Sequence, residues 1–257
     1  MKKYRIFVDG SSGTTGLRIA DRLAARPEFE LLTIAEADRK DPNARAAVIN
    51  QSDLTFLCLP DAAAKEIIPL VKEDVRILDT STAHRTASGW LYGMPELDNT
   101  RKALKTATRV AVPGCHASGF IAPVGASGAP RPLLAPEAAL CCFSLTGYSG
   151  GGKSMIAQYE AERTDEGLYA PRPYGLTLHH KHLPEMMAVC GLHTAPVFCP
   201  VVADYYAGME TVVQLQRGQL NGDAKDLAAA LSDYYAGSPV ITVHPFDPDA
   251  LPGFLPS

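Results

Sequence analysis

The chain has 257 residues, of which 46% are hydrophobic and 20% charged, and its formal net charge is −4. This composition is ordinary for a soluble globular protein, and the length allows two domains. An acidic chain with no run of like charges excludes a nucleic-acid binder held by a basic face. The N-terminal MKKYRIFVDG holds only a short apolar run, and no apolar stretch of about 18 residues follows. We therefore expect no signal peptide, no membrane span and a cytoplasmic location.

The first part of the chain alternates between strand and helix patterns, which predicts βαβ units and a parallel sheet. Apolar residues at helical spacing predict helices between the strands. The predicted strands are YRIFVD (4–9), FELLTIAEA (29–37), DLTFLCLP (53–60), VRILDT (75–80) and TRVAVPG (108–114), and the predicted helices cover 14–27, 43–50 and 62–71.

The pattern changes after Cys115, where longer strand candidates predict a mixed or antiparallel sheet. These candidates are EAALCCFSLTG (137–147), TAPVFCPVVAD (194–204) and METVVQLQRG (209–218), with a helix expected around 155–163. We therefore place a domain boundary near residue 114. Residues 1–114 are predicted to form an α/β cofactor domain, and residues 115–257 an α+β domain for catalysis and dimerisation.

Three glycines follow the first strand in VDGSSGTTG, at Gly10, Gly13 and Gly16. Glycines permit a sharp turn and a close approach to a ligand, and the next helix directs its free N–H groups at a phosphate. We therefore predict a dinucleotide site that includes Ser12, Thr14 and Thr15 of the same turn. The alternative is a plain strand-to-helix turn, because the spacing GxxGxxG is not the usual GxGxxG.

The choice between the two nicotinamide dinucleotides is made after the second strand, where the sequence is AEADRKD. An acid there binds the ribose hydroxyls of NAD, whereas a base accepts the 2′-phosphate of NADP. Glu36 and Asp38 favour NAD, while Arg39 and Lys40 favour NADP. These residues alone leave both cofactors open, and a solvated loop is the third interpretation.

Cys115 stands in AVPGCHASGF, where Pro113-Gly114 ends a strand and ASGFIAPVG can begin a helix. A cysteine at a helix N-terminus is favoured as the thiolate, so we predict a nucleophile. The alternative is a buried core thiol. His116 is expected to be a supporting residue, because adjacent helical residues do not face each other. The other five cysteines (58, 141, 142, 190 and 199) are predicted to be buried free thiols.

Two further motifs carry polar groups. In LTLHHKHLPEM, His180 and His182 share a face if the segment is extended. Without a cysteine or carboxylate pair at ligand spacing they predict a base for Cys115 and no metal. In TGYSGGGKS the phosphate-loop pattern GxxxxGKS is satisfied literally. Because the nucleotide site is already assigned to the N-terminus, we interpret it as a flexible glycine turn whose Lys153 binds an anionic substrate.

Taken together, DGSSGTTG, DTSTAHRT (79–86), YGMPEL (92–97), VPGCHAS, GYSGGGKS and HHKHLPEM resemble the N-acetyl-gamma-glutamyl-phosphate reductase family, and more its shorter type. The resemblance implies a Rossmann-like NADP(H) domain and an α+β domain with a mixed sheet. It also implies a homo-oligomer, dimer or tetramer, that makes an aldehyde from an acyl phosphate through a cysteine thioester in arginine biosynthesis.

The resemblance also assigns residues. Cys115 becomes the nucleophile and His182 the acid/base, with His180 close by. Arg85, Ser149 and Lys153 become candidates for holding the phosphate or carboxylate of the substrate, and Arg39 and Lys40 join the cofactor site.

Two other functions stay open. An aspartate-semialdehyde dehydrogenase-like enzyme shares the architecture, although it has asparagine after its cysteine and lacks the HxHxPE string. A non-catalytic dinucleotide-binding protein is the other alternative. Family members continue beyond LPGFLPS, so the resemblance implies that a glycine-rich segment and a helix that packs on the cofactor domain are absent. We therefore expect weak NADP binding and slow turnover or none.

Overall fold

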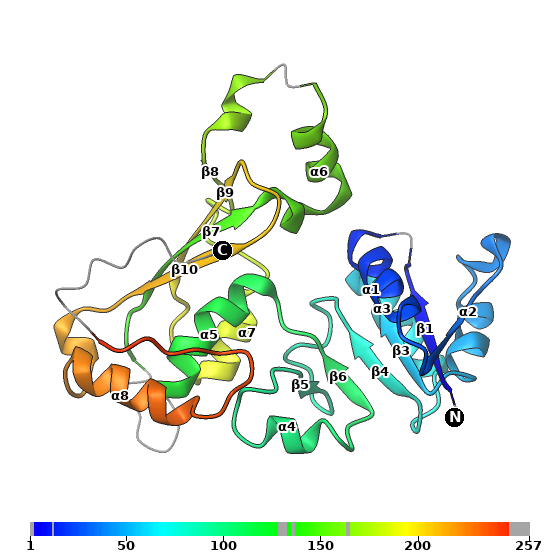
Figure 1. Cartoon of the computed structure of the whole chain (residues 1–257), viewed down its shortest axis with the longest axis horizontal. Coiled ribbons are helices and arrows are strands. Elements are labelled where there is room, and N and C mark those ends of the chain that lie inside the picture. The colour runs from blue at the N-terminus through cyan, green and yellow to red at the C-terminus, as the bar shows by residue number, and fades with distance from the viewer. Residues whose placement is uncertain (1–2, 12, 128–132, 135–136, 163–164, 247–257) are drawn as a thin grey trace. The chain divides into compact units, whose positions relative to one another are not determined.

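The computed structural model describes residues 3–11, 13–127, 133–134, 137–162 and 165–246 (Figure 1). The chain divides into two compact units, each with its own sheet. Unit 1 comprises Met1–Pro95 and Asn99–Gly114, and unit 2 comprises Glu96–Asp98 and Cys115–Ser257.

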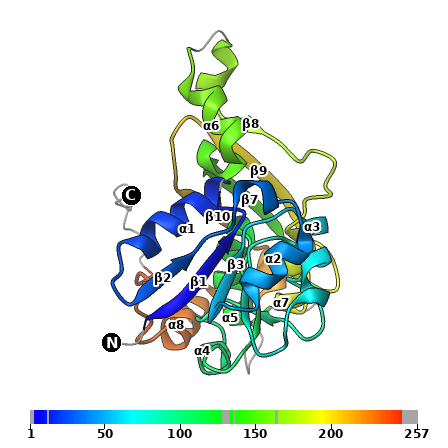
Figure 2. The ribbon, with the colours of Figure 1, turned by 90° about the vertical axis from the view of Figure 1, so that its right-hand side faces the viewer.

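Unit 1 holds a six-stranded parallel sheet with the strand order β2-β1-β3-β4-β6-β5. Figure 2 shows β2, β1 and β3 side by side. Its strands are β1 (Tyr4–Asp9), β2 (Phe29–Leu32), β3 (Leu54–Leu57), β4 (Arg76–Asp79), β5 (Leu91–Tyr92) and β6 (Arg109–Ala111). Its helices are α1 (Thr14–Ala24), α2 (Pro42–Ile49), α3 (Asp61–Ile67) and α4 (Thr100–Ala103), with 3-10 turns η1 (Glu36–Asp38) and η2 (Ile68–Leu70).

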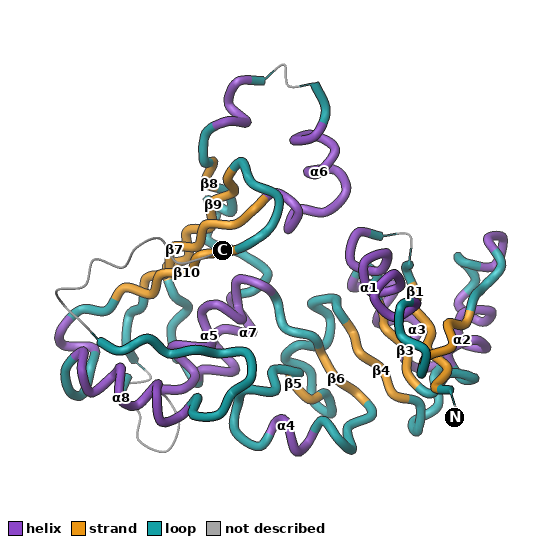
Figure 3. The backbone as a smooth tube through the Cα atoms, in the orientation of Figure 1, coloured by secondary structure: helices purple, strands orange, loops and turns teal. Residues whose placement is uncertain are grey.

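Unit 2 holds a mixed four-stranded sheet with the order β10-β7-β9-β8, in which β7 and β9 are parallel and the other pairs antiparallel. Its strands are β7 (Cys141–Gly147), β8 (Arg172–Pro173), β9 (Val197–Ala203) and β10 (Met209–Gln214). Its helices are α5 (Cys115–Ser127), α6 (Gly152–Glu160), α7 (Leu183–Cys190) and α8 (Ala224–Tyr234), with 3-10 turns η3 (Tyr148–Gly151), η4 (Glu166–Tyr169) and η5 (Arg217–Gln219). In Figure 3 the helices α5 and α7 lie side by side, and their residues are in contact.

This architecture confirms the predicted fold class, a parallel Rossmann-like sheet followed by an α+β domain with a mixed sheet. Four short elements, β5, α4, β8 and α7, carry too little periodicity to be seen in the sequence. Helix α8 has 11 residues and is also missing from the sequence prediction. The predicted strand 29–37 ends at Leu32, and residues 36–38 form the 3-10 turn η1 instead. Within the described residues, no helix is both long and apolar enough to cross a membrane.

One face of the parallel sheet is covered by α2 and α3. Successive strand residues point to opposite faces, and Phe7, Leu57 and Ile77 pack against Ile49 and Ile67 of these helices. Burial of these side chains is the main favourable contribution to the stability of unit 1.

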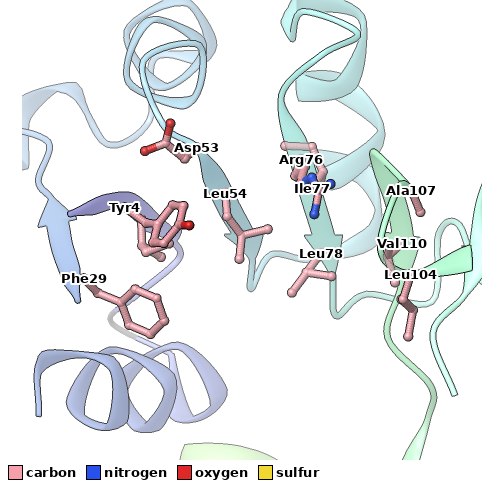
Figure 4. A pocket seen from close by; sticks show the side chains of 11 residues that line it. Tyr4, Phe29, Asp53, Leu54, Arg76, Ile77, Leu78, Leu104, Ala107 and Val110 are labelled. Carbon is pink, nitrogen blue, oxygen red and sulfur yellow. The ribbon is translucent and has the colours of Figure 1, made fainter. Parts of the chain in front are cut away.

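The opposite face of the same sheet carries an apolar groove of about 560 Å³. Figure 4 shows its wall, which is built by residues of β1, β2, β3, β4 and β6. The lining residues are Tyr4, Ile6, Phe29, Asp53, Leu54, Arg76, Ile77, Leu78, Leu104, Ala107 and Val110. Tyr4 is 55% exposed, so this end of the groove is open to solvent in the chain by itself.

A buried ion pair fixes the end of β1 just before the glycine turn. The guanidinium of Arg45, from α2, donates through Nη2 and Nε to Asp9 Oδ2, at 2.8 and 3.0 Å. Both residues are at most 5% exposed. Burial raises the pKa of the Asp9 carboxyl, and Arg45 opposes that shift by favouring the carboxylate. The pair therefore ties α2 to the strand that leads into Gly10.

Arg45→Leu is expected to lower the free energy of unfolding by about 3–5 kcal/mol, because it leaves the Asp9 carboxylate buried without a cation. Urea unfolding of the full chain measures this. The matched control is Arg39→Ala, which breaks the solvent-exposed pair with Glu36 and should cost at most about 1 kcal/mol. Equal losses in the two variants would contradict the structural role given to the buried pair.

Candidate active site

The turn after β1 is built from glycines that the backbone itself requires. Gly10 has a φ of +84°, and a Cβ there would lie 2.9 Å from the carbonyl carbon of Cys58. A Cβ on Gly16 would lie 2.8 Å from Ser11 Cα, and Gly13 N donates to Gly10 O at 3.0 Å. Backbone thus lies too close to backbone at Gly10 and Gly16 for any side chain, as in the glycine turns that let a dinucleotide approach the chain.

The structure describes the other residues predicted for this site only in part. Ser12 lies outside the described residues, and Thr14 and Thr15 open α1, although their side chains are also outside the description. Arg39 Nη1 lies 2.8 Å from Glu36 Oε2, so the base that favours NADP is paired with an acid that favours NAD. Lys40 is exposed.

The loop after β4 is ordered by a buried carboxylate. Asp79 accepts hydrogen bonds from the Ser81 backbone N–H at 2.9 Å and from Ser81 Oγ at 2.7 Å. Its Oδ2 also lies 2.6 Å from His84 Nδ1, and the His84 ring stacks on Trp90 at 4.1 Å. The DTSTAHRT motif is thus a self-bonded turn at the carboxyl end of a parallel strand, where α/β sheets place their ligands.

Arg85 follows in the same loop. Its Nε donates to Val112 O at 3.0 Å and its Nη2 to Thr80 O at 3.2 Å. The guanidinium therefore joins the chain leaving β4 to the chain leaving β6, and these bonds engage part of the group predicted to hold the substrate.

Cys115 is the first residue of α5, and its side chain is exposed. The alternative of a buried core thiol is therefore wrong. The chain runs from β6 through Val112, Pro113 and Gly114 straight into the helix, which explains why the Pro-Gly pair precedes the cysteine. A thiol at this end of a helix lies in the positive field of the helix dipole.

Helix α5 lies directly on strand β10, and Gly119 makes this possible. A Cβ on Gly119 would overlap the hydroxyl of Thr211 and lie 3.0 Å from its Cβ. The close approach brings the first turn of α5 over the middle of the sheet. Ser144 of β7, which pairs with Thr211 in register, is reached from there.

His116 occupies the centre of this contact. It is buried, its Nδ1 lies 2.7 Å from Ser144 Oγ, and its Nε2 lies 2.6 Å from the hydroxyl of Tyr174. Its ring centroid is 5.6 Å from that of His180 and 5.7 Å from that of His182. The residue expected to be merely supporting thus joins α5 to both predicted histidines.

Burial keeps this cluster uncharged. Desolvation, and next the charge of His180, lower the pKa of His116 to about 4. Desolvation, and next the Lys181 charge, also lower the pKa of His180. For Tyr174, desolvation is the larger cause and the charge of Cys115 the smaller, and together they raise its pKa to about 12. Near pH 7 both imidazoles and the phenol are therefore neutral.

His180 and His182 come together through a helix start and not through a strand. His182 is the N-cap of α7, and its N–H donates to His180 Nδ1 at 3.2 Å. The two ring centroids are 4.7 Å apart. The sequence placed these histidines on one face only if the segment was extended. The segment is not extended, and the two rings are nevertheless adjacent. They follow a sharp turn in which Gly175 and Leu178 both have positive φ values.

Glu185 lies in the first turn of α7 and is almost fully buried. Its Oε1 lies 4.0 Å from His182 Nε2. The two side chains are therefore neighbours in the first turn of α7. Among the described residues there is no group of three or more His, Cys, Asp or Glu side chains that could hold a metal ion.

The GYSGGGKS segment is structured. Strand β7 ends at Gly147, the turn η3 follows, and Lys153 stands in the first turn of α6. The backbone N–H of Ser149 donates to Tyr206 O at 3.0 Å, and is therefore directed at the neighbouring loop. A Cβ on Gly147 would lie 2.7 Å from Tyr205 O, which accounts for that glycine by packing alone.

The prediction of five buried thiols is wrong for Cys141 and Cys199, which are exposed. Both occupy outward positions in the mixed sheet, where register places Phe143 beside Cys199 and Val212. Apolar strand patterns do not reveal which of two faces a residue occupies. Val197 and Val212, on the same outer face, are 56% and 37% exposed.

Sequence reasoning missed Tyr174 and Ser144, which complete the contacts of His116. Tyr174 stands in RPYGL with no local pattern around it, and its N–H is bonded to Pro200 O of β9 at 3.0 Å. Ser144 is one polar residue in an apolar strand run. The one sign of its role in the sequence was a serine within an apolar strand, because a hydroxyl buried there normally has a hydrogen-bond partner.

Comparison with protein-family models divides the chain in two. The semialdehyde dehydrogenase NAD binding domain matches residues 5–107. The semialdehyde dehydrogenase dimerisation domain matches residues 115–252.

Curated relatives match almost the whole chain. An N-acetyl-gamma-glutamyl-phosphate reductase of a Chelativorans species is 46% identical over 253 residues, which is 94% of this chain and 79% of that relative. An N-acetyl-gamma-glutamyl-phosphate reductase 2 of a Nostoc species is 41% identical over 98% of this chain and 80% of its own length. This chain belongs to the N-acetyl-gamma-glutamyl-phosphate reductase family. It is therefore an oxidoreductase of the semialdehyde dehydrogenase type.

The fold of this reductase-family chain is shared with solved aspartate semialdehyde dehydrogenases. The Vibrio cholerae enzyme II, complexed with ASA, has a TM-score of 0.67 at 12% identity, over 93% of this chain and 80% of that one. The Candida albicans enzyme with NADP has a TM-score of 0.63 at 14% identity, over 91% and 77%. At this identity the likeness concerns the fold alone.

Gly119→Ala is expected to destabilise the chain by about 1–3 kcal/mol, because the added methyl group overlaps Thr211 in a filled contact. The matched control is Gly125→Ala in the same helix, where a Cβ would meet the flexible side chain of Ile121 at 3.1 Å. The control should be neutral or stabilising by up to about 1 kcal/mol, since alanine is the better helix former. Urea unfolding distinguishes them, and a Gly119→Ala variant as stable as the control would contradict the tight seating of α5.

Proposed function

We propose that this protein reduces N-acetyl-gamma-glutamyl phosphate to N-acetylglutamate semialdehyde and phosphate with NADPH, in arginine biosynthesis. The observation that carries the proposal is the exposed thiol of Cys115 at the start of α5, whose next residue contacts His180 and His182. The names of relatives more than 40% identical support the same substrate.

Cys115 is the nucleophile in this proposal. Its thiolate attacks the acyl carbon of the substrate, the C–S bond forms, and the bond from that carbon to the phosphate oxygen breaks, which releases phosphate and leaves a thioester. NADPH, when bound, supplies the hydride that reduces this thioester. His182 donates a proton to the carbonyl oxygen during reduction. It takes a proton back when the thiohemiacetal collapses and returns the Cys115 thiolate.

Two features support His182 as the acid/base. It is buried, and its Nε2 lies 4.0 Å from Glu185 Oε1. His180, whose pKa is lowered by burial, serves as a neutral neighbour that donates or accepts one hydrogen bond.

The glycine turn of Gly10, Gly13 and Gly16 suits the pyrophosphate of a dinucleotide, because Gly10 and Gly16 have no room for a side chain and the turn leads directly into the N-terminus of α1. Ser12, Thr14 and Thr15 complete this turn in our proposal. We assign NADP as the cofactor, with Arg39 and Lys40 beside its 2′-phosphate. Arg39 would then exchange its exposed partner Glu36 for the phosphate, at little cost.

Arg85, Ser149 and Lys153 are proposed to hold the phosphate or carboxylate of the substrate. Lys153 is the best supported of these, because it stands in the first turn of α6, where the helix dipole also favours an anion. Arg85 donates to two carbonyl oxygens, Val112 O and Thr80 O, which hold its guanidinium in position at the end of β4.

We further propose that residues 1–114 form the cofactor domain and residues 115–257 the catalytic and dimerisation domain of a cytoplasmic homo-oligomer. The apolar outer face of the mixed sheet, with Val197, Phe143 and Val212, supports association of two copies, since exposed apolar sheet surface favours burial against a partner. The cysteines of the chain are free thiols, which suits a reducing compartment.

The reverse reaction tests the proposed function. NADP, phosphate and N-acetylglutamate semialdehyde together should give a rise in NADPH absorbance that is absent when any one of the three is left out. Aspartate semialdehyde in place of the N-acetylated substrate distinguishes the related dehydrogenase activity. Binding of NADP without turnover of either aldehyde would favour a non-catalytic dinucleotide-binding protein.

Cys115→Ser should abolish this activity and leave NADP binding nearly intact, because a serine hydroxyl is a far weaker nucleophile at neutral pH. Cys199→Ser is the matched control, since it changes another exposed thiol on the outer sheet face and should retain full turnover. Activity of Cys115→Ser within about tenfold of the unchanged protein, less than 1.4 kcal/mol of barrier, would remove this cysteine from the mechanism.

His182→Asn should lower kcat by about 10²–10⁴, the usual contribution of a general acid–base group. His180→Asn should cost less, because this ring is proposed to contact the acid/base and not to transfer the proton itself. Steady-state kinetics of both variants measure the difference. A reversed order would give the proton-transfer role to His180 and leave the proposed reaction intact.

A further inference from the structure

His116 has no part in the proposed proton transfers, although it directly follows the proposed nucleophile in the sequence. It stands in the first turn of α5, is only 3% exposed, and contacts a hydroxyl group with each ring nitrogen. Its Nδ1 lies 2.7 Å from Ser144 Oγ, and its Nε2 lies 2.6 Å from the Tyr174 hydroxyl. With both nitrogens engaged, this imidazole has no position left at which to exchange a proton with a substrate.

The Ser144 hydroxyl decides the direction of these bonds, because it has one proton and three partners. Ser144 Oγ donates to Glu210 O at 3.2 Å, and this backbone carbonyl can only accept. Ser144 Oγ also lies 3.1 Å from Thr211 Oγ1, whose hydroxyl can donate. With its proton directed at Glu210 O, Ser144 has two lone pairs left, and it accepts from Thr211 and from His116. Every contact of the Ser144 hydroxyl is then a hydrogen bond.

His116 therefore carries its proton on Nδ1. The imidazole is neutral near pH 7, because burial, and next the charge of His180, lower its pKa to about 4. A neutral imidazole has one N–H donor and one acceptor nitrogen. Since Nδ1–H donates to Ser144, Nε2 accepts the proton of the Tyr174 hydroxyl. These bonds form one directed chain, which runs from the Tyr174 hydroxyl through the imidazole to the carbonyl oxygen of Glu210.

This chain of hydrogen bonds joins the start of α5 to two strands of the mixed sheet. Ser144 belongs to β7, and Glu210 belongs to β10, which pairs with β7. Because Gly119 packs the next turn of the helix on β10, α5 is held at its start by polar bonds and just beyond it by close packing. Cys115 is the first residue of α5, so its position follows from that of His116.

We propose that His116, as the Nδ1–H tautomer, is a positioning residue that anchors the first turn of α5 to Ser144 and thereby holds the Cys115 thiol in place for attack. It acts through the backbone of the helix and not by proton transfer. The inference deepens the proposed function and rests on Cys115 being its nucleophile. The tautomer and the anchoring bond themselves do not depend on the reaction.

The tautomer is tested by nuclear magnetic resonance of the full chain with isotope-labelled histidine at pH 7. Protonated and bare imidazole nitrogens have well-separated nitrogen shifts, and the signals of His116 are those that disappear in His116→Asn. We expect a protonated Nδ1 and a bare Nε2. A proton on Nε2 would overturn the proposal, since Nδ1 could then only accept from Ser144.

Two substitutions separate the two hydrogen bonds of the imidazole. Asparagine carries its amide as many bonds from Cβ as Nδ1, so His116→Asn keeps a donor for Ser144. Glutamine carries its amide as many bonds from Cβ as Nε2, so His116→Gln keeps only the contact with Tyr174. His116→Gln should lower kcat about 10- to 100-fold, as for a misplaced reacting group, with KM changed less than about threefold. His116→Asn should recover most of this loss, and equal kcat values of the two variants would overturn the proposal.

Hydrogen exchange measures the anchor without any substrate. His116→Gln should raise the exchange rate of the backbone amides in the first turns of α5 about tenfold, because one buried hydrogen bond is lost. Ser144→Ala removes the same bond from the side of the strand and should reproduce this change and the fall in kcat. It therefore decides the question if His116→Gln does not fold. Unchanged exchange in either variant, once folded, would also overturn the proposal.

Ser52→Ala is the matched control in unit 1. It removes another buried serine hydroxyl, which donates to Ile49 O at 2.8 Å and lies 2.8 Å from Thr55 Oγ1. The variant should lose comparable stability in urea unfolding and keep both kcat and the exchange of α5 unchanged. A fall in kcat equal to that of Ser144→Ala would mean that only stability is measured, and would reject the positioning role.

The outcomes separate this inference from the proposed function. A protonated Nδ1 and faster exchange in His116→Gln, in a protein that turns over neither aldehyde, would keep the anchor and reject the reductase reaction. Reductase activity in a protein whose His116 carries its proton on Nε2 would keep the reaction and reject the anchor.

Discussion

The close approach of helix α5 to strand β10 at Gly119 is the constraint on which the candidate site of unit 2 depends. Because no side chain separates the helix from Thr211, the first turn of α5 descends far enough for His116 to reach Ser144. The same descent leaves Cys115 exposed at the helix start. One missing methyl group thus decides both where the thiol lies and which buried groups stand behind it.

Exclusion of charge is the second common feature of this unit. His116, His180 and Tyr174 all have pKa values displaced toward the neutral form, chiefly by burial. The buried Glu185 carboxylate beside His182 is the exception in the cluster. Two of the groups around His116 are thus kept neutral by burial, and the one acidic side chain of the cluster stands beside His182.

The candidate cofactor site of unit 1 also depends on glycines that have no room for a side chain. Gly10 and Gly16 are imposed by backbone atoms of Cys58 and Ser11, and the strand that enters the turn is fixed by the Asp9–Arg45 ion pair. At the carboxyl end of β4, Asp79 and Arg85 complete the loops through bonds to neighbouring backbone and side chains. The loops at this edge of the sheet are therefore held by bonds among themselves.

The sequence by itself determined the parallel α/β half, the mixed second sheet, the glycine turn and Cys115, because each rests on local periodicity or on a short motif. It also indicated His180 and His182 as a pair of neighbouring histidines. Only the tertiary structure decided that the two histidines meet through the start of α7, that Cys141 and Cys199 face outward, and that Tyr174 and Ser144 enclose His116. These contacts join residues 28 and 58 positions apart in the chain, and they depend on strand register and helix seating. Strand register and helix packing cannot be read from the neighbouring residues of the sequence. A buried serine or tyrosine looks the same in a sequence whether or not it has a partner in the fold.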